Sequence, residues 1–221
     1  MIHPSTFRFL KDLKENNNKP WFDENRKRYE TAKENFADFI DALILQFGKK
    51  DKTISHLKAK DCMFRINRDV RFSKDKAPYK TNFGAYINGE GKKSFRAGYY
   101  FHLEPGKSFT GGGIWQPPAD VLAKLRQEID YNLSNFEKII HSNKFKTVFN
   151  GLSSAEGAKL TRVPKGYEAD NPAAEYLKYK NFVAIHSLTD KGLAQPELVT
   201  KIASVFEALQ PLNNFLNVGL E

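Results

Sequence analysis

The sequence CMFRINRDVRFSKDKAPYKTNFGAYIN, residues 62–88, is where the hydrophobic pattern of the chain changes from a helical period to a period of two. A period of two is typical of β-strands, because successive side chains of a strand point to opposite faces of the sheet. The pattern predicts a first strand over 62–72 and a second over 81–88. In the first strand, one face would carry the apolar residues Phe64, Ile66, Val70 and Phe72.

Three further strands are expected downstream of this stretch. The glycines of Gly89-Glu90-Gly91 predict a tight connection into a third strand over 95–104, and a fourth is expected over 109–115. A short apolar run predicts a fifth strand over 182–188. Strands spaced so closely along the chain favour an antiparallel meander over 62–115, with one face covered by helices.

Helical patterns flank the predicted sheet on both sides. Residues 1–50 are expected to be helical, with one helix from Pro4 to the asparagine run at 16–18 and a second from Pro20 to Phe47. Residues 117–221 are expected to be helical apart from the fifth strand. The fold class predicted is therefore α+β, and no linker divides the chain, so we expect a single domain over 1–221.

Composition indicates a globular protein with a basic surface. The 221 residues are 40% hydrophobic, and Lys and Arg outnumber Asp and Glu by 35 to 26. The hydrophobic content argues against disorder, and the excess of basic residues favours anionic partners without proving one. Cys62 is the only cysteine, which excludes an internal disulfide. The chain also lacks a long uninterrupted apolar segment, so we expect a cytoplasmic protein with no membrane partner.

Metal and cofactor sites are not expected. The five histidines, at positions 3, 56, 102, 141 and 186, are scattered without the spacing of metal ligands. The run FTGGGIW at 109–115 lacks the Lys-Ser/Thr pair of a phosphate-binding P-loop. Three glycines in a strand more often mark a bulge or a close approach of the backbone, so we expect no cofactor there.

The polar face of the first predicted strand is the main candidate for a binding site. Arg65 and Arg71 would share this face with an amide and a carboxylate, and guanidinium groups suit phosphate or carboxylate oxygens. The charged loop that follows adds further candidates. The predicted ligand-binding residues are Arg65, Arg68, Arg71, Lys76, Tyr79 and Lys80. The alternative is a rigid polar cluster in which the three arginines pair with Asp69, Asp75 and the acidic residues of the second predicted helix.

Three residues are candidates for proton transfer. His102 and Glu104 would lie on the same face of the third strand, where an imidazole and a carboxylate can form an acid–base pair. Asp69 is the third candidate. The alternative is that His102 and Glu104 form an ordinary hydrogen-bonded pair at the end of a sheet. Strand alternation does not settle whether the face of Arg65 and the face of His102 coincide.

Four motifs resemble the family called domain of unknown function 2461, in the expected order and over nearly the whole chain. They are NNNKPWFDENRKRYE at 16–30, RINRDVRFSKDKAPYKTNFGAY at 65–86, AGYYFHLEPGKSFTGGGIW at 97–115 and KLTRVPKGYEADNPAAEYLKYKNF at 159–182. The resemblance implies no reaction, but it directs attention to residues inside the motifs. These include the six ligand-binding candidates, the three proton-transfer candidates and also Trp21, Asn25, Arg26, Phe72, Asp75, Pro78, Thr81, Tyr99, Gly112, Gly113, Pro164, Gly166 and Lys180.

Three classes of function remain open from the sequence. The first is binding of a phosphorylated or carboxylated small molecule through the Arg/Lys cluster, either as a binding protein or as an enzyme. The second is nucleic-acid binding, in which Phe72, Tyr79 and Tyr86 would stack on bases. The third is an interaction protein that contacts an acidic partner.

Overall fold

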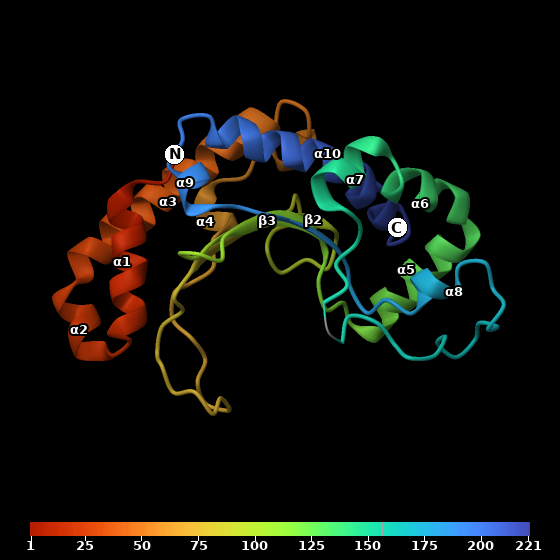
Figure 1. Cartoon of the computed structure of the whole chain (residues 1–221), viewed down its shortest axis with the longest axis horizontal. Coiled ribbons are helices and arrows are strands. Elements are labelled where there is room, and N and C mark those ends of the chain that lie inside the picture. Colours follow the sequence, from red (N-terminus) through yellow and green to blue (C-terminus); the bar gives the residue numbers. More distant parts are fainter. Residues whose placement is uncertain (156) are drawn as a thin grey trace. The chain divides into compact units, whose positions relative to one another are not determined.

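The computed structural model describes residues 1–155 and 157–221 and confirms the α+β class (Figure 1). Its four strands form one antiparallel sheet in which the spatial order follows the chain order, β1-β2-β3-β4. The strands are β1 (Phe83–Ile87), β2 (Gly98–Leu103), β3 (Phe109–Ile114) and β4 (Phe182–Ser187). Four of the five predicted strands are thus confirmed.

The described helices lie before and after the first three strands, as the sequence predicted. Before them come α1 (Pro4–Glu15), α2 (Lys19–Glu24), α3 (Arg26–Phe47), a 3₁₀ turn (Lys52–Ile54) and α4 (Ala59–Cys62). After them come α5 (Ala119–Tyr131), α6 (Leu133–Ile140), α7 (Asn143–Phe149), α8 (Ala174–Leu177), α9 (Asp190–Leu193) and α10 (Leu198–Val218).

The helix predicted from Pro20 to Phe47 is wrong at one point, because it is divided at Asn25. The Asn25 side chain donates a hydrogen bond to the carbonyl of Trp21 at 2.9 Å, and its backbone leaves the helical conformation (φ −101°, ψ 18°). Asparagine side chains compete with the helix for backbone partners in this way. Asn18 caps the start of α2, since its side chain accepts a hydrogen bond from the Trp21 N–H.

The described residues form two compact units. Unit 1 comprises Met1–Lys92, Tyr100–Thr110 and Ser187–Ala203, and unit 2 comprises Lys93–Tyr99, Gly111–His186 and Ser204–Glu221. The single domain expected over 1–221 stays a prediction.

The core of unit 1 lies between α3 and the inner face of β1 and β2. The Phe36 and Phe83 rings stack with centroids 5.3 Å apart, and the Phe39 and Phe101 rings lie 4.8 Å apart. The helical stripe of α3 and the alternate residues of both strands therefore fill one face of this part of the sheet. The residues between them, among them Tyr100 and His102, are left on the other face.

The core of unit 2 contains the glycine run, where the predicted close approach of the backbone is confirmed. A Cβ atom at Gly112 would lie 2.0 Å from the Gly98 carbonyl oxygen, and one at Gly113 would lie 2.0 Å from that of Phe182. Gly113 also has a φ of +110°, which side-chain-bearing residues rarely adopt. The run brings strands together and packs under the α10 side chain of Leu209.

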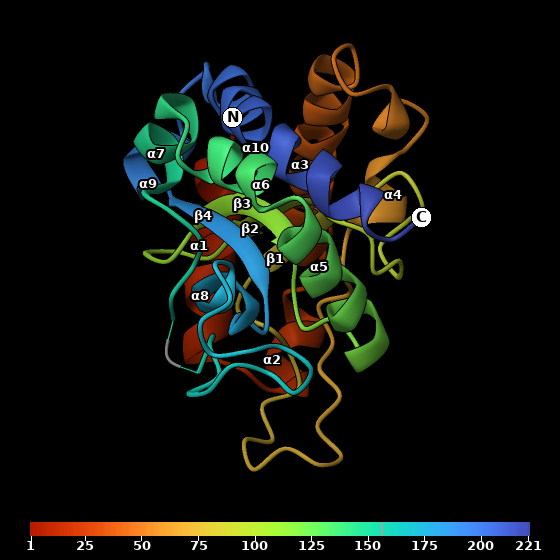
Figure 2. The same cartoon turned by 90° about the vertical axis from the view of Figure 1, so that its right-hand side faces the viewer.

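The strand predicted over 62–72 is wrong. Cys62 ends α4, and pairing is limited to isolated antiparallel bridges of Met63 with Ala85 and of Asn67 with Tyr79. Residues 64–80, called the basic loop below, run out from β1 as a long excursion (Figure 2). Its expected apolar face is not buried throughout, since Phe72 is 95% exposed and Phe64 39% exposed.

The basic loop stays irregular because its own side chains occupy the backbone groups that a neighbouring strand would need. The guanidinium of Arg68 donates to the Ala77 carbonyl at 3.0 Å, and the ammonium of Lys76 donates to the Val70 carbonyl at 3.1 Å. Pro78 also lacks the N–H that a central strand must donate.

Candidate functional site

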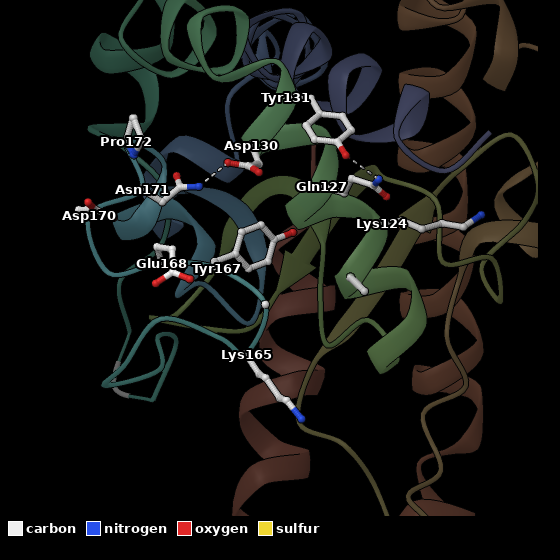
Figure 3. Close-up of a pocket in the computed structure, with 12 residues that line it drawn as sticks. Lys124, Gln127, Asp130, Tyr131, Lys165, Tyr167, Glu168, Asp170, Asn171 and Pro172 are labelled. Atoms are coloured by element: carbon white, nitrogen blue, oxygen red, sulfur yellow. Dashed lines mark hydrogen bonds between the residues drawn. The ribbon is translucent and has the colours of Figure 1, made fainter.

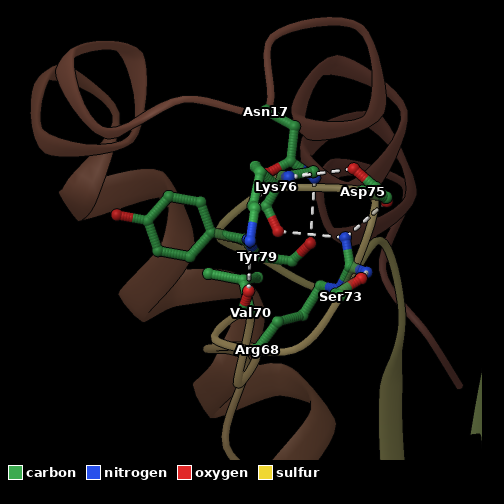
Figure 4. A network of polar contacts seen from close by, with 8 residues as sticks. Asn17, Arg68, Val70, Ser73, Asp75, Lys76 and Tyr79 are labelled. Atoms are coloured by element: carbon green, nitrogen blue, oxygen red, sulfur yellow. Dashed lines mark hydrogen bonds and ion pairs between the residues drawn. The ribbon is translucent and has the colours of Figure 1, made fainter.

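Arg68 is the centre of a network that holds the basic loop together (Figure 4). One of its terminal nitrogens, Nη1, donates to Asp75 Oδ2 at 2.6 Å and to the Ala77 carbonyl at 3.0 Å. The other, Nη2, lies 3.4 Å from the Ser73 hydroxyl. Asp75 in turn accepts from the Ala77 N–H at 2.9 Å. Arg68 therefore shapes the loop, and most of its donors have partners within the loop.

Arg71 and Asp69 form an exposed, bidentate ion pair. Arg71 Nε donates to Asp69 Oδ1 at 3.0 Å, and its Nη2 donates to Oδ2 at 2.7 Å. These hydrogen bonds hold the pKa of Asp69 below its ordinary value, so Asp69 would be a weak proton acceptor. In this region, the structure agrees with the alternative of internal ion pairing and not with arginines that converge on a ligand.

Tyr79 packs beneath the loop. Its ring is 6% exposed and stacks on Phe22 with centroids 3.9 Å apart. The side-chain amide of Asn17 donates to the Tyr79 carbonyl at 2.9 Å, and its Oδ1 accepts from the Tyr79 N–H at 3.1 Å. Asn17 thus takes the place of a neighbouring strand and fixes the returning arm of the loop to the helical part of unit 1.

Arg65 and Lys80 differ from the other basic candidates. Within the described residues, neither side chain makes a hydrogen bond or an ion pair, whereas those of Arg68, Arg71 and Lys76 do. The Lys80 ammonium lies 5.5 Å from the centre of the Phe64 ring. Burial first, and the charge of Arg65 second, lower the pKa of Lys80. Lys80 is thus a partly desolvated cation that has a second cation close enough to act on it.

A chain of hydrogen bonds runs along the outer face of β2. The Tyr100 hydroxyl lies 3.0 Å from His102 Nδ1, and His102 Nε2 lies 3.2 Å from Glu104 Oε2. The imidazole stacks on Phe109 at 4.7 Å, with the two ring planes 13° apart. The side chains of His102 and Glu104 are only 14% and 20% exposed. The predicted pairing of His102 with Glu104 is confirmed as a contact, and Tyr100 extends it.

The pKa values of this chain indicate where its protons lie. Burial raises the pKa of Tyr100 to about 12, so the phenol stays protonated at neutral pH. Burial lowers the pKa of His102, against the opposing effect of Glu104, so the imidazole is neutral there. Because a carboxylate only accepts, the imidazole proton belongs on Nε2, and Nδ1 accepts from Tyr100. Asn82 Nδ2, at 3.5 Å from Nδ1, is a weaker second neighbour.

Contacts connect Lys80 to the Tyr100–His102–Glu104 chain. The Phe64 ring beneath the Lys80 ammonium lies 6.5 Å from the Tyr100 ring, and Asn82, two residues after Lys80, reaches His102. Phe64 and Asn82 thus relate Lys80 to the face of β2 that carries His102. Three residues near this chain were not among the predicted site residues: Phe64, Asn82 and Gly84. Gly84 leaves room for the Tyr100 hydroxyl.

Unit 2 contains a separate open pocket of about 850 Å³ (Figure 3). It lies between α5 and residues 165–172, where Asn171 Nδ2 donates to Asp130 Oδ1 at 2.7 Å and holds the loop against the helix. None of the predicted site residues lines it. Its one signal in the sequence was Gly166, which falls within the fourth motif of the family resemblance.

Three further observations concern the described residues. Across 1–155 and 157–221, no three His, Cys, Asp or Glu side chains are grouped as a metal site requires. No helix in the same part of the chain has the length and apolarity to cross a membrane. Burial raises the pKa of the Cys62 thiol to about 12, so it is a poor nucleophile.

Comparison with known proteins gives one match. The model of the family described as conserved hypothetical protein, domain of unknown function 2461, matches residues 5–215. No curated protein and no solved structure matches the chain.

Proposed function

We propose that this chain, which belongs to the conserved hypothetical family called domain of unknown function 2461, binds a phosphate- or carboxylate-bearing small molecule against Lys80 and Arg65. The observation that carries the proposal is that the Lys80 ammonium, which has no acidic partner in the described residues, lies 5.5 Å from the centre of the Phe64 ring. That ring is 6.5 Å from the ring of Tyr100, which begins the hydrogen-bonded chain to His102 and Glu104.

Electrostatics supports an anion at this position. Burial penalises the charge of Lys80, and Arg65 adds repulsion, which is why the pKa of Lys80 is lowered. The charge of an anion between the two cations would oppose both effects and stabilise the charged form of Lys80. Guanidinium and ammonium groups bind phosphate or carboxylate oxygens by charge-assisted hydrogen bonds, which are stronger than neutral ones.

Proton transfer is the chemistry that the neighbouring chain supports. When solvent has protonated His102 at Nδ1, the Tyr100 hydroxyl can give its proton to a ligand oxygen and take the Nδ1 proton in exchange, so that the imidazole returns to its neutral form. Glu104 favours that protonated state, because its carboxylate accepts from Nε2. If the protein is an enzyme, we infer that the ligand is held by Lys80 and Arg65 while Tyr100 acts as the acid or base, with His102 as its proton partner.

Calorimetric titration tests this proposal. The probes would be inorganic phosphate and a panel of phosphorylated and carboxylated metabolites, applied to the wild type, Lys80→Met and Arg65→Gln. Charged hydrogen bonds contribute about 1.5–3 kcal/mol, so we expect each substitution to weaken binding by roughly 10-fold or more. Lys33→Met, which removes an exposed cation of α3, should bind as the wild type does. Equal affinities for all four proteins would contradict the proposal.

A further inference from the structure

Phe72 is the most exposed large apolar side chain of those identified in the described residues, with 95% of its surface accessible. It lies in the irregular part of the basic loop, between residues that the Arg68 network brings together. The guanidinium carbon of Arg71 lies 5.8 Å from the centre of its ring. An aromatic ring exposed to this degree gains nothing from folding, so its packing does not explain its place there.

The loop that presents Phe72 is held in a defined shape. Arg68 links both arms through Asp75 and Ala77, and Lys76 binds the Val70 carbonyl. Arg71 is held by its two hydrogen bonds to Asp69. A ring presented by such a framework loses little conformational freedom when a partner binds it, which is a property of strong interface anchors.

Positive charge is distributed along the whole length of the loop. Arg65 and Lys80 lie at its base, where the backbone N–H of Lys80 donates to the Ile66 carbonyl. Lys74 and Lys76 lie between that base and Phe72 in the sequence and are exposed. The stretch 65–81 contains six basic residues against two acidic ones. Such a distribution complements a linear polyanion that lies along the loop.

We propose that the basic loop is a docking surface for single-stranded nucleic acid, with Phe72 stacked on a base and the basic side chains along the loop in contact with phosphates. Stacking on an aromatic ring together with a row of cations is how proteins bind single strands without sequence preference. The surface goes beyond the anion site described above, because neither Phe72 nor Lys74 takes part in that site.

Two other partners fit these observations less well. In a duplex, each base is already stacked on its neighbours, so Phe72 would have no free base face to contact. A membrane would meet only the end of the loop, and one aromatic side chain is a weak anchor. Arg65 and Lys80, at the base of the loop, would contribute less to the binding of a duplex or a membrane than to the binding of a flexible single strand.

Fluorescence anisotropy with a labelled oligothymidylate, in about 50 and 200 mM salt, tests the proposal. Stacking contributes enough that Phe72→Ala should weaken binding by roughly 5- to 100-fold. Phe72→Trp should retain or improve it. The affinity should fall with salt by about 0.7 log units per log unit of salt for each phosphate contacted. Because Phe72 is solvent-exposed, both variants should fold normally, which circular dichroism would check.

The controls separate this surface from its alternatives. Lys33→Met should bind the oligonucleotide as the wild type does, and Phe72→Ala should still bind inorganic phosphate as the wild type does. Absence of oligothymidylate binding, or binding that is equal in the wild type and Phe72→Ala, would overturn the proposal. A preference for the matching duplex, or binding to phosphatidylserine vesicles that depends on Phe72 without oligonucleotide binding, would also overturn it.

Discussion

The Tyr100 hydroxyl reaches His102 Nδ1, 3.0 Å away, through space that exists because Gly84 has no side chain. A Cβ atom at Gly84 would lie 2.6 Å from the Tyr100 hydroxyl oxygen and 3.3 Å from the ring carbon that bears it. Gly84 on β1 therefore sets the position of Tyr100 on β2. Tyr100 in turn donates the hydrogen bond that His102 Nδ1 accepts.

Gly84→Ala is expected to displace the Tyr100 ring and break its hydrogen bond to His102. Overpacking of this kind lowers the free energy of unfolding by about 1–3 kcal/mol. The penalty should shrink when Tyr100→Phe is also present, because the atom in the closest contact is then absent. Urea denaturation of the four proteins of this double-mutant cycle measures the coupling. A penalty of the same size in both backgrounds would show that the two residues act independently.

Acidification is expected to remove stability that the neutral His102 provides. Because the folded pKa of His102 lies below the unfolded value of 6.5, the unfolded chain binds more protons below that pH. The contribution is therefore present above pH 6.5 and is lost as the pH falls below it. The stability difference between the wild type and His102→Gln should shrink from about pH 7.5 to about pH 5.5. The other four histidines are common to both proteins and cancel. A difference that grows on acidification would mean that an imidazolium–Glu104 pair dominates.

Arg68→Gln is expected to loosen the basic loop without unfolding unit 1. It removes the bonds from Arg68 to Asp75 and Ala77, but the partners lie in a largely exposed loop, so the free energy of unfolding should fall by only about 1 kcal/mol. Amide hydrogen exchange should accelerate throughout 68–77. Arg71→Gln, which breaks an exposed pair, is the matched control and should leave exchange outside its immediate neighbours unchanged. Equal effects of the two substitutions would contradict the central role of Arg68.

Gly113→Ala is expected to be severely destabilising. The new Cβ atom would lie 2.0 Å from the Phe182 carbonyl oxygen, in a backbone with φ +110°. Both strain and collision oppose it, so we expect a loss of more than about 4 kcal/mol. Gly91→Ala is the control for strain alone, since Gly91 has φ +89° and no atom within 4 Å of the new Cβ atom. Losses of equal size in thermal or urea unfolding would show that the strand contact at Gly113 can relax.

The four confirmed strands were predictable because their signals are local. Alternating apolar residues, bounded by turns such as Pro105-Gly106, identify β2 and β3 without knowledge of any partner. The stretch 62–72 shows the same alternation, yet the Lys76 ammonium occupies its Val70 carbonyl, and the Arg68 side chain reaches out of the stretch to the Ala77 carbonyl. Alternation alone does not reveal such hydrogen bonds, although Arg68 falls on the expected apolar face, between Ile66 and Val70, and interrupts it.

The candidate site was predictable only in part. Alternation correctly placed His102 and Glu104 on one face of a strand, and the structure adds Tyr100 to them. The same rule applied backwards from β1 relates Lys80, Asn82 and Gly84, but their contribution depends on which strand lies beside β1. The separation of Lys80 from the internally paired Arg68 and Arg71 depends on the path of the basic loop, which is determined by distant residues such as Asn17.

Titration of Lys80 by NMR, without and with inorganic phosphate, tests the anion site most directly. Without the anion, the pKa of the Lys80 ammonium should lie below its ordinary value of 10.5, because of burial and Arg65. At a phosphate concentration that saturates the wild type the pKa should rise, and it should rise less in Arg65→Gln, which binds the anion more weakly and is not saturated at that concentration. A Lys80 pKa that does not change while phosphate binds elsewhere, or phosphate that does not bind at all, would contradict the account.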